Sequence, residues 1–169
     1  TNAILDRKGT IDKYMGDAIM AFWNAPLSDQ EHQVNACNAA LDMIDRIEAL
    51  NVEREQEAKE SGKSFIPMKV GIGLNTGTCV VGNMGSNLRF DYSVLGDAVN
   101  LASRLEGQSK SYGVPIIAGS ATALAAKDIP DARLRLDHVL KMTEDATHRT
   151  LDLIEQTAAW RSICKATDR

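Results

Sequence analysis

The sequence of 169 residues is long enough for one domain but not for two full ones. It is 44% hydrophobic and 25% charged, with a formal net charge of -4 at pH 7. This acidic balance argues against a nucleic-acid-binding domain, because such domains are usually basic. The longest apolar run, Ala18 to Trp23, is far shorter than the roughly 20 residues that span a bilayer. The sequence therefore predicts a globular domain with no membrane helix.

The first part of the chain predicts a hairpin followed by a helix. The β-prone runs Thr10–Met15 and Ala18–Trp23 are separated by Gly16-Asp17, which favours a tight turn. Ser28 to Glu31 has the pattern of a capping box and predicts the start of an amphipathic helix. The charged stretch Asn51–Ser64 is expected to form the frayed end of that helix and a solvated loop.

The second part predicts strands and helices in irregular alternation. The expected elements are a hairpin of Met68–Leu74 with Thr78–Val81, a strand Arg89–Leu95, a helix from the N-cap Asp97 to Tyr112 stopped by Gly113, a strand Val114–Ala118, a short helix Ser120–Ala126, and an antiparallel pair Arg133–Leu140 with Thr150–Ile154. This pattern indicates an α+β fold on an antiparallel or mixed sheet. The domain is expected to span residues 1–156, and residues 157–169 to form a C-terminal tail or short helix.

The cysteines indicate the redox environment of the protein, and the first residues indicate where in the fold the chain begins. Cys37, Cys79 and Cys164 are widely spaced and odd in number, so reduced thiols in a cytosolic protein are expected rather than disulfides. No secretory signal opens the chain. The first residues instead have the pattern of a last helical turn that ends at Gly9, so we expect the chain to begin in the middle of a fold.

The glycine-rich segments do not match the common phosphate-binding loops. Gly62-Lys63-Ser64 lacks the earlier glycine of a P-loop, since Glu57 occupies that place. The pair Gly71 and Gly73 is followed by Thr76 where a dinucleotide fingerprint needs a third glycine. These glycines are expected to serve tight turns and close strand crossings.

Three side chains are candidates for chemistry. Asp17, at the tip of the predicted hairpin, can offer both carboxylate oxygens to a hard cation, although Gly-Asp is also ordinary turn chemistry. Asn100 and Arg104 stand at i and i+4 on one side of a predicted helix, where they could hold a ribose and a phosphate or could be a solvated face. The three histidines lack the helical spacing of a zinc site and are assigned no role.

Three blocks of sequence, in order, resemble the catalytic domain of class III nucleotide cyclases of bacterial type. They are Lys13–Phe22, the glycine-rich segment Val70–Gly77 with Val81–Ser86, and Asp91–Glu106. The resemblance covers about Ile4 to Glu155. It implies a ferredoxin-like core with flanking helices and a head-to-tail homodimer with active sites at its interface. The implied reaction is attack of a ribose 3′-hydroxyl on the α-phosphorus of a nucleoside triphosphate, with two divalent cations, Mg²⁺ or Mn²⁺, as cofactors.

The resemblance also assigns roles to individual residues. Asp17 corresponds to one of two metal-bridging aspartates, Asn100 to the residue that orients the ribose, and Arg104 to the group that stabilises charge on the transferring phosphorus. Lys13 and Ser93 match the pair that reads the base, and a lysine suits the acceptor N1 of adenine. Guanylate-specific relatives place Glu and usually Cys there, so ATP is the expected substrate. Ser93 departs from the Asp or Thr usual in adenylate cyclases but keeps a hydroxyl.

Two further departures from the family pattern affect the predicted site. The family's first metal-binding aspartate lies upstream of the part matched here, and Asp6 and Asp12 are too close to Asp17 to replace it. We therefore expect a domain truncated at its N-terminus and lacking its first strand. Lys141 has lost the glycine of the family's Lys-Gly turn, and it is expected, with Arg89, to contact the triphosphate.

The resemblance leaves a second interpretation open. If the first aspartate were absent from the whole protein, the domain would be a catalytically incomplete regulatory or dimerisation module that binds nucleotide. Lys13 disfavours a guanylate cyclase. Because such domains commonly follow sensor or membrane segments, an upstream domain of that kind and a cytoplasmic location are expected, with no nucleic-acid partner.

Overall fold

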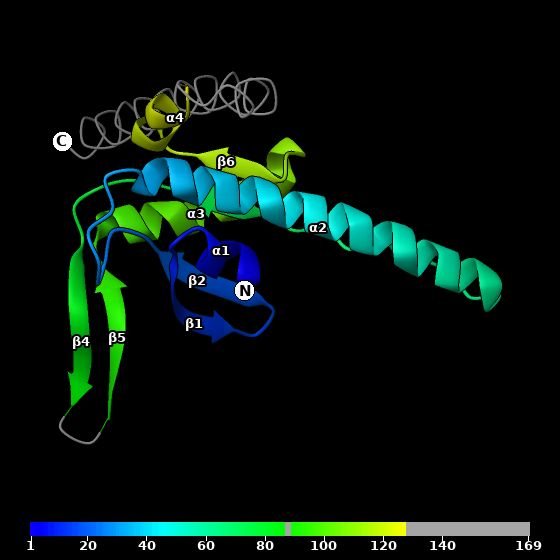
Figure 1. The fold of residues 1–169 in the computed structure, drawn as a ribbon, viewed down its shortest axis with the longest axis horizontal. Helices are drawn as coiled ribbons and strands as arrows, with labels where there is room; N and C mark the ends of the chain where they lie inside the picture. The colour runs from blue at the N-terminus through cyan, green and yellow to red at the C-terminus, as the bar shows by residue number, and fades with distance from the viewer. Residues whose placement is uncertain (87–88, 128–169) are drawn as a thin grey trace, which may run out of the picture.

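The structure is a computed structural model that describes residues 1–86 and 89–127. Its elements are, in chain order, α1 (Asn2–Asp6), β1 (Thr10–Met15), β2 (Ala18–Phe22), α2 (His32–Glu60), β3 (Ile72–Leu74), β4 (Val80–Ser86), β5 (Arg89–Leu95), α3 (Asp97–Tyr112), β6 (Ile116–Ala118) and α4 (Ser120–Ala126) (Figure 1). The antiparallel pair and the tail that the sequence predicts beyond residue 130, together with Lys141, lie outside the described residues. Within the described ranges, no helix combines the length and apolar character needed to cross a membrane.

The described strands pair two by two. β1 and β2 form the predicted antiparallel hairpin. The prediction that Met68–Leu74 pairs with the next strand is wrong, because β3 instead runs parallel to β6, with Ile72 opposite Ile116. β4 pairs with β5 along its whole length, from Val80 opposite Leu95 to Ser86 opposite Arg89, and this long hairpin projects from the rest of the molecule (Figure 1).

The core lies where α2 and α4 meet the β3–β6 pair. Its buried members are small or aliphatic: Ala36, Cys37, Ala40, Ile72, Leu74, Ile116, Ala118, Ala123 and Ala126. Alanines on the helices let their backbones approach the strands closely, so apolar area is removed from water without large side chains. Burial raises the pKa of the Cys37 thiol to about 11, so this thiol stays protonated at pH 7, as a buried structural cysteine does.

The start of α2 differs from the predicted capping box. The helix begins at His32, and Ser28 makes no cap. The acceptor is Asp29 instead, whose carboxylate receives the Glu31 N–H at 3.3 Å and the Asn35 amide at 2.7 Å. The hydrogen bond from Asn35, with lesser help from the Glu31 N–H and from Lys8, lowers the pKa of Asp29. An Asx-type turn therefore replaces the serine cap.

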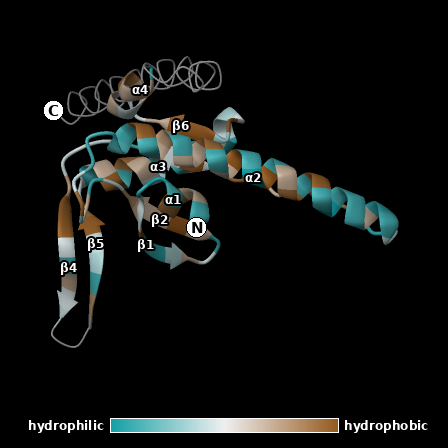
Figure 2. Ribbon diagram, in the orientation of Figure 1, coloured by the Kyte–Doolittle hydropathy of each residue, from teal (hydrophilic) through white to brown (hydrophobic). Residues whose placement is uncertain are grey.

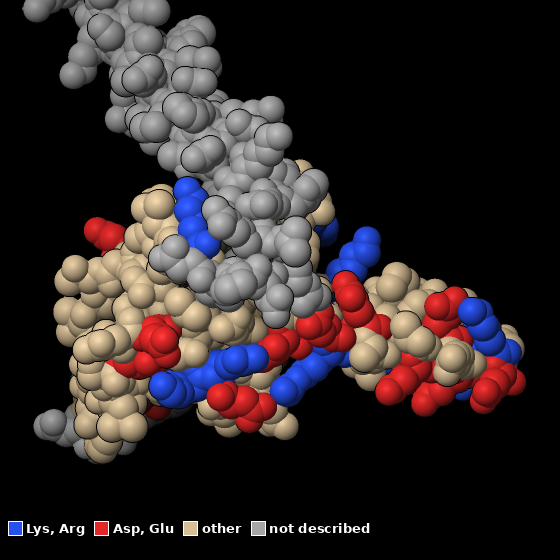
Figure 3. Space-filling model, turned by 45° about the horizontal axis from the view of Figure 1, so that its top comes forward, with Lys and Arg blue, Asp and Glu red and all other residues tan. Residues whose placement is uncertain are grey.

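The charged stretch after Asn51 continues the helix, as predicted, but the helix extends further than a frayed end and leaves only residues 61–64 of this stretch outside it. α2 continues to Glu60, and its last turns carry Glu55 and Lys59 as an i, i+4 pair at 2.8 Å. Good helix formers and such pairs support a helix without tertiary packing. Figure 2 shows this end as mainly hydrophilic, and Figure 3 shows charges of both signs on it.

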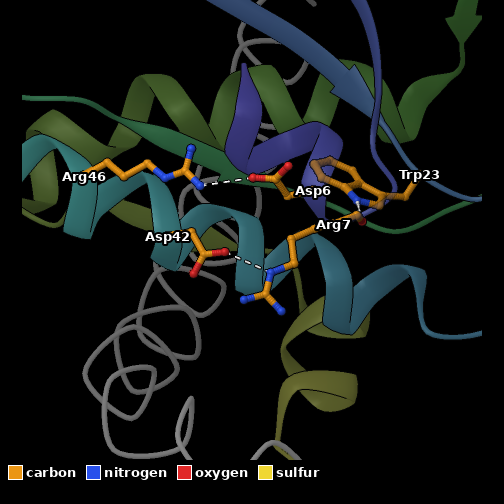
Figure 4. A network of polar contacts seen from close by, with 5 residues as sticks. All are labelled: Asp6, Arg7, Trp23, Asp42 and Arg46. Atoms are coloured by element: carbon orange, nitrogen blue, oxygen red, sulfur yellow. Dashed lines mark hydrogen bonds and ion pairs between the residues drawn. The ribbon is translucent and has the colours of Figure 1, made fainter.

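Polar contacts attach α1 and the β1–β2 hairpin to α2. Arg7 Nε donates to Asp42 at 2.9 Å, and Arg46 donates to Asp6 at 3.2 Å (Figure 4). The Trp23 indole N–H donates to the Arg7 carbonyl at 2.9 Å. Half-exposed ion pairs contribute only about 0.2–1 kcal/mol each. Their value here is orientation, because they fix the hairpin relative to the core.

The glycines of the 70s segment allow α3 to lie directly on β3. A Cβ at Gly73 would overlap the backbone of Ala102 and Glu106, and one at Gly71 would overlap the Ser109 hydroxyl. This close approach confirms the packing role expected for these glycines. α3 itself starts at Asp97, with Gly96 as N-cap rather than the predicted Asp97, and ends as predicted at Gly113, whose φ is 68°.

Replacing Gly73 with alanine should destabilise the domain. Its new methyl group would have to displace the α3 backbone, which costs about 1–3 kcal/mol or more. Urea unfolding followed by circular dichroism measures this loss. Gly82→Ala is the matched control, because nothing lies within 4 Å of a Cβ at that strand position. Equal midpoints for the two variants would contradict the packing role.

Candidate functional site

The β1–β2 hairpin presents Asp17 at its tip. Met15 is opposite Ala18, so Gly16 and Asp17 form a two-residue turn, and Gly16 takes the left-handed φ of 64° that such a turn requires. Asp17 is exposed. The turn predicted from Gly16-Asp17 is confirmed, and it leaves the carboxylate accessible to a ligand.

A β-bulge in β1 changes the direction of Asp12. Ile11 is opposite Ala21 and Lys13 is opposite Met20, so Asp12 is an extra residue on this strand. Bulges disturb the regular alternation of side chains and can redirect one of them. The Asp12 side chain is 0% exposed, whereas the neighbouring Lys13 side chain is 44% exposed.

The Asp12 carboxylate joins the two residues predicted to read the base. Ser93 Oγ donates to Asp12 Oδ2 at 2.6 Å, and the Val94 N–H lies 3.4 Å from the same oxygen. Lys13 Nζ lies 3.3 Å from Asp12 Oδ1. That contact is an ion pair without hydrogen-bond geometry, since Oδ1 accepts no hydrogen bond. Lys13 and Ser93, from β1 and β5, thus meet at opposite oxygens of one carboxylate.

Asp12 is the residue of this site that the sequence interpretation missed. It entered that interpretation only as an aspartate too close to Asp17 for a shared metal site. The signal needed was the bulge, and nothing in the sequence of β1 marks it. Without the bulge, alternation along the strand gives no reason for a carboxylate at position 12 to turn inward.

Asn100 and Arg104 lie on the helix that directly follows Ser93 in the chain. Both are exposed on α3, in its first two turns. The Gly96 carbonyl accepts the N–H groups of Val99 and Asn100, which links the end of β5 to the start of the helix. Asn75, at the end of β3, donates to the Ala98 carbonyl at 3.0 Å and holds this helix start in place. One strand–helix unit, β5 and α3, therefore carries Ser93, Asn100 and Arg104 close together in the chain.

The backbone of Arg89 lies at the other end of β5 from Ser93. Arg89 is the first residue of this strand and pairs with Ser86. At about 3.3 Å per residue, it is roughly 13 Å along the strand from Ser93.

Asp17 has the chemistry of a cation ligand, but the described residues do not form a complete ligand set with it. Carboxylate oxygens suit Mg²⁺ and Mn²⁺. In residues 1–86 and 89–127 there is no group of three or more His, Cys, Asp and Glu side chains able to hold a metal ion. Asp6 is paired with Arg46, and Asp12 is buried against Ser93.

The comparisons with known proteins agree on one family. The family model for the adenylate and guanylate cyclase catalytic domain matches residues 6–143. Adenylate cyclase 1 of Rhizobium meliloti is 39% identical over 121 residues, which are 72% of this chain and 17% of that protein. The adenylate cyclase of Anabaena cylindrica is 44% identical over 116 residues, 68% of this chain and 22% of that one. The chain thus spans about a fifth of the length of these relatives.

Solved structures give the same result for the fold. The guanylyl cyclase Cya2 superposes with a TM-score of 0.61 at 37% identity, covering 75% of this chain and 60% of that one. The adenylyl cyclase CyaB from P. aeruginosa superposes with a TM-score of 0.60 at 35% identity, covering 76% of this chain and 63% of that one. The fold is therefore the α+β cyclase fold that the motifs predicted. With its Gly-Asp hairpin, the glycine-rich segment 70–77 and the β5–α3 unit, the chain belongs to the class III nucleotide cyclases, the adenylate and guanylate cyclase family.

Proposed function

We propose that this domain is an adenylate cyclase that converts ATP to 3′,5′-cyclic AMP and pyrophosphate. The observation that supports the choice of ATP is the pairing of Lys13 and Ser93 on the Asp12 carboxylate. An ammonium can donate to N1 of adenine but not to the N1–H of guanine. Overall similarity does not decide the base, since relatives named for both activities match the chain.

In the proposed reaction the residues of the β5–α3 unit position the substrate. Asn100 would hydrogen-bond the ribose and direct its 3′-oxygen toward the α-phosphorus. Arg104, one turn along the same exposed side of α3, would donate to the phosphate oxygens as negative charge develops. Asp17 would be one ligand of the two divalent cations, which when bound would supply neutralisation of the triphosphate. Arg89 and Lys141 remain proposed triphosphate contacts.

A homodimer with shared active sites is the second part of the proposal. Large apolar side chains are exposed on the projecting β4–β5 hairpin and on α3: Val80, Phe90, Tyr92, Leu95 and Leu101, with exposures from 37% to 69%. Exposed apolar side chains gathered on neighbouring elements are typical of an interface. A second copy of the domain would cover them and could bring Arg89 of one protomer to the site of the other.

The domain organisation of the parent protein and the location of the cyclase domain are also part of the proposal. Because the chain spans about a fifth of its relatives' length, we propose that the parent protein carries an upstream sensor or membrane segment. The cyclase domain would then lie in the cytoplasm, where its nucleotide substrate is found.

The decisive experiment is product detection. The full-length protein is incubated with ATP or GTP and Mn²⁺ or Mg²⁺, and cyclic nucleotides are measured by mass spectrometry. We expect cyclic AMP from ATP and little cyclic GMP from GTP, with no product when the cation is chelated. A folded, dimeric protein that binds nucleotide but forms no product would indicate a regulatory module instead.

Replacing Asp17 with asparagine should abolish turnover and leave the fold intact. The substitution removes a carboxylate ligand, so we expect kcat to fall by about 100-fold or more. As an exposed turn residue, Asp17 should contribute less than about 0.5 kcal/mol to stability. The control is Glu55→Gln, which removes an exposed carboxylate on the distal part of α2, outside the site. Activity surviving in Asp17→Asn would exclude the metal role.

Exchanging the base-reading pair should change the preferred nucleotide. In the double variant Lys13→Glu with Ser93→Cys, an acceptor replaces the donor that faces N1, so the ATP:GTP ratio of kcat/KM should fall by about tenfold or more. The ratio is the required measurement, because placing Glu beside buried Asp12 also lowers stability and affects both substrates equally. A ratio equal to that of the wild type would show that the base is read elsewhere.

A further inference from the structure

The Asp12 carboxylate is the most constrained charged group near the proposed site. Its side chain is 0% exposed, and it lies on a bulge of β1 beneath the half-exposed Lys13. Burying a carboxylate costs free energy unless hydrogen bonds and opposite charge compensate it. Asp12 has both kinds of compensation, and they come from Ser93 and Lys13, the two residues assigned to base reading.

The contact with Asp12 fixes the direction of the Ser93 hydroxyl. A serine hydroxyl has one proton to donate and lone pairs with which to accept, and its rotor normally suits either role. Here the proton is directed at Asp12 Oδ2 over 2.6 Å, the short distance of a charge-assisted hydrogen bond. Ser93 is itself only 6% exposed, so water competes little for this proton. Toward a ligand, Ser93 can therefore act only as an acceptor.

The same carboxylate holds the Lys13 ammonium. One side of this group faces Asp12 Oδ1 at 3.3 Å, and an ammonium has three N–H donors, so donors remain for a ligand. Lysine side chains carry large rotamer entropy, which an ion pair with a rigid, buried partner reduces. Lys13 is thus held as a donor beside an acceptor.

We propose that Asp12 is a positioning residue that sets nucleotide selectivity by fixing the hydrogen-bond polarity of its two neighbours. A donor at Lys13 beside an acceptor at Ser93 matches the N1 acceptor and the 6-amino donor of adenine. The same pattern opposes guanine, which presents an N1–H donor and a 6-oxo acceptor. This inference rests on the proposed function, because it assumes that Lys13 and Ser93 face the base.

The principal test compares substitutions at Asp12 by their effect on selectivity. In Asp12→Ala the Ser93 hydroxyl is free to rotate and can donate to a 6-oxo group. The ATP:GTP ratio of kcat/KM should then fall by about tenfold or more, the discrimination expected of one buried hydrogen bond. Asp12→Asn retains an oxygen for Ser93 and the Val94 N–H, so it should keep the ratio within about threefold of the wild type.

Asp29→Ala is the matched control. It removes a carboxylate whose side chain is only 9% exposed and which is paired with Lys8 and accepts hydrogen bonds from Asn35 and the Glu31 N–H, outside the site. It should lower stability without changing the ratio. If Asp12→Ala lowers the melting temperature while the ATP:GTP ratio stays at the wild-type value, Asp12 is only structural and the proposal is wrong.

A second measurement keeps the proposal testable if Asp12→Ala fails to fold. The probe is the triphosphate of purine riboside, which lacks the 6-amino group, competing with a ribose-labelled fluorescent nucleotide. Wild-type protein should bind ATP about tenfold more tightly than this analogue, and Ser93→Ala should bind the two alike. An equal preference for ATP in both proteins would show that Ser93 does not accept from the 6-amino group, and the proposal would fall.

The binding assay also separates this inference from the proposed function. A protein that binds ATP with the expected selectivity but forms no cyclic nucleotide would contradict the catalytic proposal and support the role of Asp12. A protein that forms cyclic AMP, but whose selectivity does not change with substitutions at Asp12 and Ser93, would support the catalytic proposal and contradict the role of Asp12.

Discussion

The direct seating of α3 on β3 is the contact on which the arrangement of the site depends. Gly71 and Gly73 let the helix approach the strand at backbone distance, and the Asn75 amide holds the first turn through the Ala98 carbonyl. Because β5 leads into α3 without a loop, the same contact fixes the end of β5. The position of Ser93 relative to Asn100 and Arg104 is therefore decided by glycines that have no part in the chemistry.

The β1–β2 hairpin contributes Lys13 and Asp17. It reaches the core through Trp23 and through the neighbouring α1, which combines two buried apolar residues, Ala3 and Ile4, with partly exposed ion pairs. Its main connection to β5 is the buried Asp12, supported by the tilted stacking of Phe22 and Tyr92, whose ring centroids are 6.0 Å apart. At this junction the buried carboxylate of Asp12 joins two elements that apolar contacts would join elsewhere. Unlike apolar contacts, its hydrogen bond to Ser93 is directional.

Sequence reasoning succeeded where local rules decide the structure. The Gly16-Asp17 turn, the strand 89–95, the helix ending at Gly113 and the short helix 120–126 all follow from turn chemistry, caps and periodicity. It failed where tertiary contacts decide, because the short strand 72–74 has no local signal for its distant parallel partner. It underestimated the length of the charged end of α2 for another reason, since charge patterning alone does not separate a solvated helix from a solvated loop. In the site, motif resemblance named Lys13 and Ser93, but only the bulge at Asp12 reveals how they are joined.

The long helix α2 divides at Asn51 into two parts of different physical character. There, the Asn51 amide exchanges two hydrogen bonds of 2.8 Å with the backbone of Met68 on the returning chain, while the buried residues of the helix all lie before Asn51. Beyond this contact, the hydrogen bonds of the described structure join the helix only to itself and to residues 61–63, which directly follow it. The distal segment therefore obeys the thermodynamics of an isolated peptide helix, whose length responds to temperature and ionic strength while the domain below it stays folded. The amides of α2 should accordingly exchange slowly before Asn51 and rapidly after it, rather than share one protection factor.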